Sequence, residues 1–180
     1  RDMIIDGDVD GDGRADITID GNHQSHIFDL SGAQTDVTLR SLHLTNGYGF
    51  YSGGAIRAQD IQTLTVRNST IINNGTYRSG GGIAAFGTEV RLFNSLLANN
   101  SAYNSGGGIY LDGQSPGTLV NTTLFQNNAR LSGGGILLAA QTSPASNRTF
   151  ILNSTVTRNY ASSTGFEEDN GGGIFNRNAE

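Results

Sequence analysis

The stretch Ser79-Gly80-Gly81-Gly82-Ile83 decides the fold, because the chain returns to it at a nearly constant interval. It recurs in residues 105–109 and 132–136, and looser copies occupy residues 52–56 and 170–174. The isoleucines of the five copies are 27, 26, 27 and 38 residues apart. A fixed period of this length indicates a repeat architecture, in which each repeat is one unit stacked on the next.

Three short apolar phrases fill each repeat, and corners rich in glycine and asparagine separate them. Glycine is too frequent for stable helices and no segment keeps a helical periodicity, so we expect the phrases to be short strands. Each strand would pair in parallel with its equivalent in the next repeat, about 4.8 Å away. The sequence therefore predicts an all-β fold, a right-handed parallel β-helix (solenoid) of about five turns of about 27 residues. One wall of its core is the column of Ile56, Ile83, Ile109, Ile136 and Ile174.

Asparagine recurs in register with these isoleucines and is expected at the corners. It tolerates the left-handed backbone conformation, and its amide can bond the next asparagine or a free backbone group. Two ladders are predicted, one of Asn68, Asn94, Asn121 and Asn153 and the other of Asn74, Asn100, Asn127 and Asn159. A leucine-rich repeat is excluded because its Leu-x-x-Leu-x-Leu phrase is missing, and a propeller blade would be about 40 residues long.

Composition and charge narrow the class of protein. The 180 residues contain 26 glycines and no cysteine, which excludes disulfides and thiolate metal sites. Residues 1–36 are strongly acidic and residues 37–160 are basic, a distribution that does not suit a nucleic-acid binder. No apolar run is long enough to span a membrane. We expect residues 1–20 to form a calcium-binding loop with the first strand, and residues 21–180 a single elongated repeat domain that is a piece of a longer chain.

The acidic stretch near the N-terminus has the spacing of a calcium loop. Asp8, Asp10, Asp12 and Asp16 fall at positions 1, 3, 5 and 9 of such a loop, and the carbonyl of Arg14 falls at position 7. Calcium takes six to eight hard oxygen ligands in flexible geometry, which these groups supply. Asp6 is an alternative to Asp12, Asp20 is a possible extra ligand, and a solvated acidic turn is the competing interpretation.

This loop resembles those of dockerins, thrombospondin type 3 repeats and integrin propellers. It differs from an EF-hand because its position 12 is Ile19 instead of glutamate. The resemblance therefore implies structural Ca²⁺ and not a calcium sensor.

A second candidate site is a column that stands three residues after the second asparagine of each repeat, or after Gly47 in the first copy. Its members are Phe50, Tyr77, Tyr103 and Arg130. Stacked rings beside a guanidinium suit the faces of sugars, and they equally suit plain corner packing. The three histidines include the pair His23 and His26, for which no third metal ligand stands out.

The repeats also resemble a known family of bacterial surface proteins. Gly53-Gly54-Ala55-Ile56 and the phrase at residues 125–128 are similar to the paired GGA(I/L/V) and FxxN motifs of chlamydial polymorphic outer membrane proteins. Those proteins are autotransporter adhesins with a right-handed β-helix passenger, so the resemblance implies a secreted, cell-surface location and an adhesive role.

The function expected from the sequence is an extracellular structural or adhesive module, stabilised by calcium and without enzymatic activity. Its expected partners are further copies stacked end to end into a fibre or the remainder of a longer chain, together with a glycan or a cell-surface partner. The alternative is a polysaccharide-active lyase or glycoside hydrolase, which would need paired acids or a base beside calcium carboxylates. Two longer connections, residues 141–148 and 161–170, interrupt the repeat and are further candidate binding loops.

Overall fold

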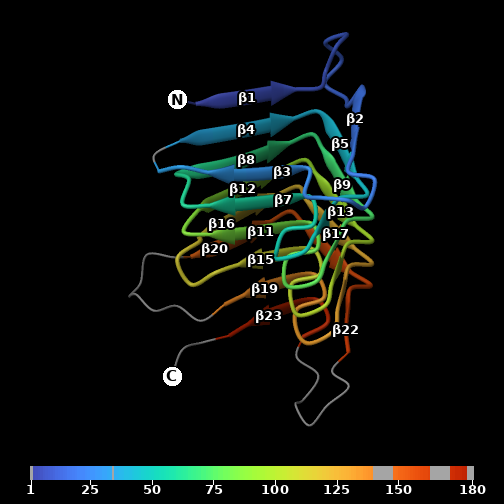
Figure 1. The fold of residues 1–180 in the computed structure, drawn as a ribbon, viewed down its shortest axis with the longest axis vertical. Coiled ribbons are helices and arrows are strands. Elements are labelled where there is room, and N and C mark those ends of the chain that lie inside the picture. Colours follow the sequence, from blue (N-terminus) through green and yellow to red (C-terminus); the bar gives the residue numbers. More distant parts are fainter. Residues whose placement is uncertain (1, 34, 140–147, 163–170, 178–180) are drawn as a thin grey trace.

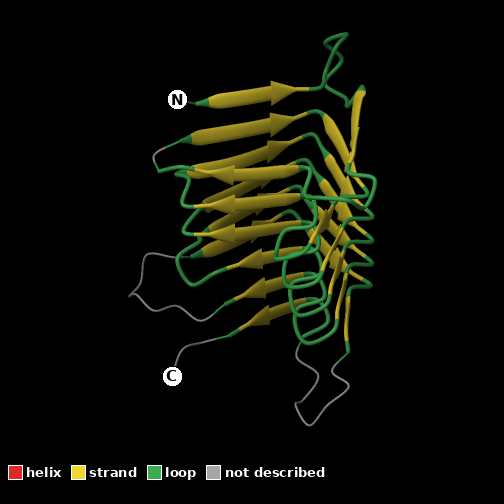
Figure 2. Ribbon diagram, in the orientation of Figure 1, coloured by secondary structure: helices red, strands yellow, loops and turns green. Residues whose placement is uncertain are grey.

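The structure is a computed structural model that describes residues 2–33, 35–139, 148–162 and 171–177. This described part contains 23 β-strands and no helix (Figure 2). It accordingly contains no helix that is long and apolar enough to cross a membrane. The chain winds as a stack of coils, with the N-terminus at one end and the C-terminus near the other (Figure 1).

Every strand pairs in parallel with the equivalent strand of the next coil, which produces four sheets along the stack. Sheet A contains β1 (Met3–Asp6), β4 (Asp36–Arg40), β8 (Thr63–Arg67), β12 (Glu89–Phe93), β16 (Gly117–Val120) and β20 (Thr149–Leu152). Sheet B contains β2 (Ile17–Asp20), β5 (Leu42–Thr45), β9 (Thr70–Ile72), β13 (Leu96–Ala98), β17 (Thr123–Phe125) and β21 (Thr155–Thr157).

The other two sheets complete each coil. Sheet C contains β3 (Phe28–Ser31), β7 (Ile56–Gln59), β11 (Ile83–Phe86), β15 (Ile109–Leu111), β19 (Ile136–Leu138) and β23 (Ile174–Asn176). Sheet D contains the two-residue strands β6 (Tyr48–Gly49), β10 (Gly75–Thr76), β14 (Ser101–Ala102), β18 (Asn128–Ala129) and β22 (Tyr160–Ala161).

This arrangement confirms the predicted right-handed parallel β-helix and refines it in two respects. Four coils, from β4 to β19, are regular, while the coil at each end is irregular, so the turn count differs slightly from the five expected. Each regular coil also has a fourth, two-residue strand in sheet D, which the three-phrase pattern did not predict. Most of the two longer connections lies outside the described residues.

The core is a set of aliphatic columns that face inward from sheets A, B and C. Ile56, Ile83, Ile109 and Ile136 pair in register along sheet C and are fully buried, as predicted. Ile174 continues the column in the last coil but is 41% exposed. The isoleucine column therefore becomes exposed to solvent only where the stack of described coils ends.

The repeated Ser-Gly-Gly-Gly phrase is explained by a left-handed backbone conformation and by close approach to the next coil. The first glycine, such as Gly80 with a φ of +73°, adopts a left-handed conformation that other residues rarely take. The second approaches the next coil so closely that a Cβ on Gly107 would lie 2.4 Å from the carbonyl oxygens of Asn128 and Gly134. The third also lies against the next coil, since a Cβ on Gly108 would lie 2.6 Å from the Gly135 carbonyl oxygen and 3.2 Å from the Asn127 side chain.

The two predicted asparagine ladders exist but have different environments. Asn68, Asn94, Asn121 and Asn153 are exposed, have φ values from 47° to 50°, and the first three are linked by amide hydrogen bonds of 3.1 Å. Asn74, Asn100 and Asn127 are buried, and each donates through its side-chain amide to the next asparagine of the ladder. In this buried ladder it is the preceding residue, such as Asn73 or Asn99, that has the positive φ. The two ladders therefore stabilise different corners of the coil.

Candidate functional site

The acidic loop joins β1 to β2 at the N-terminal end of the stack. Its base is anchored to the rest of the solenoid, because the Gly7 amide donates to the Arg40 carbonyl and the Asp16 amide donates to the Gly7 carbonyl, each at 3.0 Å. Gly11 and Gly13 both have a φ of +82°, and these left-handed residues let the loop reverse sharply. The loop therefore projects from the end of a paired strand, and its base is fixed by hydrogen bonds.

Three of the four predicted carboxylates converge within this loop. Asp8, Asp10 and Asp16 each offer one oxygen, and these oxygens lie within 4.8 Å of one another. The carboxylate of Asp8 accepts from the amides of Gly11 (2.7 Å) and Gly13 (3.0 Å), and that of Asp16 accepts from the Val9 amide (2.7 Å). The backbone is therefore wrapped around hard oxygen donors of the type that Ca²⁺ takes.

The other predicted acids lie apart from this group. Asp12 accepts a hydrogen bond from the Arg14 amide at 2.8 Å and forms an exposed ion pair with the Arg14 side chain at 3.8 Å. Asp6 forms an ion pair with Arg40 at 2.7 Å, and the hydrogen bond from Arg40 lowers the pKa of the Asp6 carboxyl. Asp20 belongs to the next corner, where hydrogen bonds from the Asn22 backbone amide and then the Asn46 side chain lower its pKa.

The histidines are used as packing groups at the corners. The Nδ1 atom of His26 is hydrogen bonded to the Gly53 carbonyl of the next coil, and that of His43 to the Thr70 hydroxyl. Among the described residues, the cluster of Asp8, Asp10 and Asp16 is the one group of His, Cys, Asp and Glu side chains close enough to share a metal ion. The pair of His23 and His26 is therefore not supported as a metal site.

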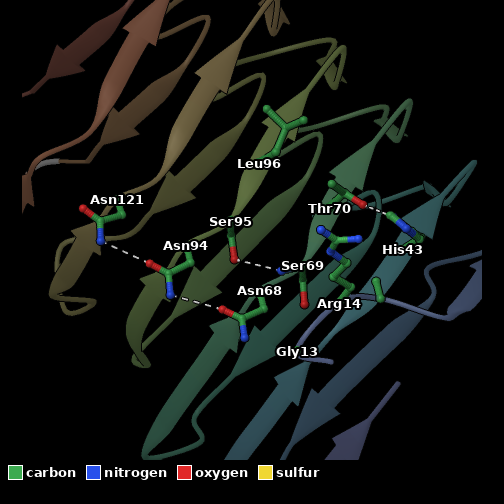
Figure 3. A pocket seen from close by; sticks show the side chains of 11 residues that line it. Gly13, Arg14, His43, Asn68, Ser69, Thr70, Asn94, Ser95, Leu96 and Asn121 are labelled. Carbon is green, nitrogen blue, oxygen red and sulfur yellow. Dashed lines mark hydrogen bonds between the residues drawn. The ribbon is translucent and has the colours of Figure 1, made fainter. Parts of the chain in front are cut away.

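A groove of about 730 Å³ runs along the corner between sheets A and B. Gly13, Arg14 and Ala15 of the acidic loop form part of its wall, and the exposed asparagine ladder forms another part (Figure 3). His43, Ser69, Thr70, Ser95 and Leu96 complete the lining. We call this the corner groove. Its polar groups are amides, hydroxyls, one imidazole and one guanidinium, and none of its lining residues is acidic.

The predicted aromatic column forms a continuous stack, which we call the aromatic ladder. Phe50 stacks on Tyr77 with ring centroids 5.9 Å apart, and Tyr77 stacks on Tyr103 at 4.9 Å, each pair with an interplanar angle of 9°. The guanidinium carbon of Arg130 lies 4.6 Å from the Tyr103 centroid and closes the ladder. The three rings are between 45% and 67% exposed, so the ladder lies on the surface of the solenoid.

The stacking leaves little ring face for a ligand. Both faces of Tyr77 are covered by neighbouring rings, and Tyr103 lies between Tyr77 and Arg130. What the ladder presents to solvent is a row of ring edges and tyrosine hydroxyls. This geometry supports the packing interpretation of the column more directly than sugar stacking on its faces.

A groove that sequence reasoning missed lies beside the aromatic ladder. Its volume is about 300 Å³, and its lining residues are Tyr51, Ser52, Arg57, Gln59, Arg78 and Phe86; we call it the arginine groove. Tyr51 and Arg78 directly follow the ladder residues Phe50 and Tyr77, so the repeat register could have indicated a second column there. Strand alternation next to the inward Ile56 indicates that Arg57 faces outward, but the sequence does not show that the loop carrying Tyr51 and Arg78 lies beside it.

Comparison with known protein families agrees with this architecture. Residues 10–179 match the model of the right handed beta helix region, and the chain belongs to this family. No curated protein and no solved structure matches the chain. The family includes enzymes and non-enzymes, so membership establishes the fold and leaves the activity to the sites described above.

Proposed function

We propose that this chain is an extracellular structural or adhesive module, a β-helix shaft whose N-terminal loop binds one Ca²⁺ ion. The observation that carries the proposal is the convergence of Asp8, Asp10 and Asp16 within 4.8 Å on an ordered loop. The spacing of the motif predicts two further ligands from the same loop, the Arg14 carbonyl and Asp12, although Asp12 lies apart from the three converging carboxylates in the structure.

Calcium would stabilise the first coil because it offsets the repulsion among three neighbouring carboxylates. The same loop connects β1 with β2, which pair with β4 and β5 of the next coil. A loop that is ordered by a metal ion would therefore hold the outermost strands of sheets A and B against the regular shaft.

An extracellular location is proposed on the same grounds. Loops of this type with modest affinity are saturated where calcium is abundant, as it is outside cells. The regular coils support a structural role, because most of their polar side chains belong to columns that repeat from coil to coil. Within the described residues, β1 and β20 each pair on one side only, so further copies could add to the edges of sheet A.

The test of calcium binding is a melting curve in calcium and in excess chelator, together with calorimetric titration of the metal. At a free Ca²⁺ concentration about 100 times the dissociation constant, binding adds about 2.7 kcal/mol to the free energy of unfolding. For a chain of this size that corresponds to a rise of roughly 5 to 10 °C in melting temperature.

Matched variants localise the effect to the loop. Asp16→Asn should abolish the calcium-dependent rise, because it removes one of the three converging carboxylates. Asp2→Asn, which lies outside the loop, should keep the rise. A melting curve that does not respond to calcium in the unaltered chain, with no heat of binding, would refute the calcium proposal.

A polysaccharide-active enzyme is the second candidate, and the corner groove is the observation that favours it. The groove spans several coils and is lined by His43 and Arg14, which could serve as proton-transfer or charge-stabilising groups. A panel of polysaccharides should be assayed both for retention and for cleavage. Retention without cleavage supports the adhesive module, and turnover of any polysaccharide by the chain alone would select the enzyme.

A further inference from the structure

We propose that the arginine groove binds one anionic sugar unit, a uronate or a sulfated sugar. The proposal rests on the adhesive function and assigns it a class of ligand and a binding site. Four side chains carry it: Tyr51, Arg57, Arg78 and Phe86, which line the same groove of about 300 Å³. Small-molecule pockets range from about 300 to 1,000 Å³, so this groove suits a single sugar ring.

Two strands of sheet C and the loops that precede them make the groove. Arg57 and Gln59 from β7 and Phe86 from β11 project from sheet C, where Gln59 and Phe86 are register partners. Tyr51 and Arg78 come from the loops that precede these strands in two successive coils. The groove is thus a product of the stacking of two coils, with one cation contributed by each.

The charges of the groove favour an anion. Arg57 is held in place, because its Nη1 donates to Asp29 at 3.0 Å and its Nη2 donates to Gln59. Arg78 is exposed, and its guanidinium carbon lies 6.0 Å from the Tyr51 ring centroid. In the part of the chain that the structure describes, Arg78 forms no ion pair, so the groove has one positive charge in excess. Guanidinium groups bind carboxylate and sulfate oxygens through paired N–H donors.

The aromatic side chains favour a sugar over a simple inorganic anion. Tyr51 contacts Phe50 edge to face, with centroids 5.4 Å apart, and Phe86 contacts Tyr110 at 5.5 Å. These neighbours fix the positions of both rings at the groove. Rings that line a small groove provide apolar surface for the C–H groups of a sugar, and the Gln59 amide can bond its hydroxyls.

The groove is held in shape before any ligand arrives. The Thr76 hydroxyl lies 3.0 Å from the Tyr51 carbonyl and accepts from the Arg78 amide at 3.2 Å. The Arg78 carbonyl in turn accepts from the Asn104 amide at 2.8 Å. Because the backbone beneath both side chains is bonded to its neighbours, a ligand would not have to order it, and this strengthens binding.

The experiment is calorimetric titration of the full chain with three probes. Trigalacturonate tests the carboxylate, N-acetylglucosamine 6-sulfate tests the sulfate, and neutral galactotriose controls for the ring alone. We expect one of the two anionic probes to bind, in calcium and in chelator alike, more weakly at high salt and at least about tenfold more tightly than galactotriose. Arg78→Gln should weaken that binding about 10- to 100-fold, the range for a charged hydrogen-bonded pair.

Two variants complete the design. Tyr51→Leu should weaken the binding of the anionic sugar without disrupting the fold. Arg91→Gln removes an arginine that pairs with Glu89 at 2.7 Å on sheet A, and it should leave binding unchanged. Failure of both anionic probes, equal binding of galactotriose, or unchanged affinity in Arg78→Gln would each overturn the proposal. If the chain retained a neutral glycan but bound neither anionic probe, the proposal for the arginine groove would be refuted while the adhesive function survived. The two failures are therefore distinguishable.

Discussion

Replacing Asn100 by alanine tests the buried asparagine ladder at its centre. The Asn100 side chain is fully buried, and its Oδ1 accepts from the backbone and side-chain amides of Asn74 at 3.1 and 3.0 Å. Its Nδ2 donates to the Ile71 carbonyl at 2.9 Å and to the Asn127 side chain at 3.0 Å. Alanine would remove all four hydrogen bonds and open a small void beside Gly82.

The expected loss of stability follows from these bonds. A net contribution of about 1 kcal/mol for each bond gives about 4 kcal/mol. The backbone amide of Asn74 has no other acceptor within the described residues, and a buried donor that is left without a partner costs about 1 to 3 kcal/mol by itself. We therefore expect Asn100→Ala to lower the free energy of unfolding by about 3 to 5 kcal/mol, a large part of the total for an ordinary domain.

The assay is urea unfolding followed by circular dichroism, with Asn94→Gly as the matched control. Asn94 lies in the exposed ladder, and its φ of 49° is one that glycine adopts without strain. Its two amide hydrogen bonds compete with water, so we expect a loss below about 1 kcal/mol. Equal losses for the two variants, or a loss below about 1 kcal/mol for Asn100→Ala, would refute the view that burial makes this ladder important.

Three further predictions concern other parts of the shaft. Gly107→Ala should destabilise the fold strongly, and urea unfolding should show it, because the new Cβ would lie 2.4 Å from the Asn128 carbonyl oxygen. Ile109→Asp should prevent folding, since it buries an unpaired charge in the fully covered isoleucine column, and loss of the β-sheet dichroism signal checks this. Asp6→Asn should be less stable than the unaltered chain at neutral pH. Arg40 lowers the pKa of Asp6, so the stabilisation is present above the unfolded pKa of about 3.9 and disappears as pH falls through the lower folded value. The two melting temperatures should therefore converge at strongly acidic pH, and a constant gap would contradict the assignment.

Much of the fold could be predicted from the sequence, because each coil of a solenoid has the same structural requirements and the residues that meet them recur. The isoleucine column, the glycine corners and both asparagine ladders were predicted because the same residue types recur at a fixed interval. The two-residue strands of sheet D were not predicted, because their shared feature is one small buried residue in each coil, such as Thr76 or Ala102, which is too short to form an apolar phrase. Backbone pairing holds these strands together with their buried second residues, and the Thr76 hydroxyl also donates to the Gly49 carbonyl at 2.8 Å.

The candidate sites were predictable only where a local motif specified them. The acidic loop was identified from its spacing, yet the spacing assigned Asp12 an equal role, and the structure gathers Asp8, Asp10 and Asp16 without it. The difference arises because Asp12 bonds to its neighbour Arg14, a contact within the turn that the ligand pattern does not include. The arginine groove escaped the sequence analysis because its residues come from two coils and two faces.

The aromatic ladder and the arginine groove show how the same repeat register produces two different surfaces. When identical rings recur at a spacing close to that of the coils, their faces meet each other, as Tyr77 and Tyr103 do at 4.9 Å. The ring faces of such a column contact each other instead of a ligand, and the column stabilises the corner. The next column changes from Tyr51 to Arg78 between coils, so its members cannot stack as equals, and the charge of Arg78 remains directed at a groove. In a solenoid, a specific binding site is therefore expected where successive members of a column differ in chemistry, beside a column whose rings stack on each other.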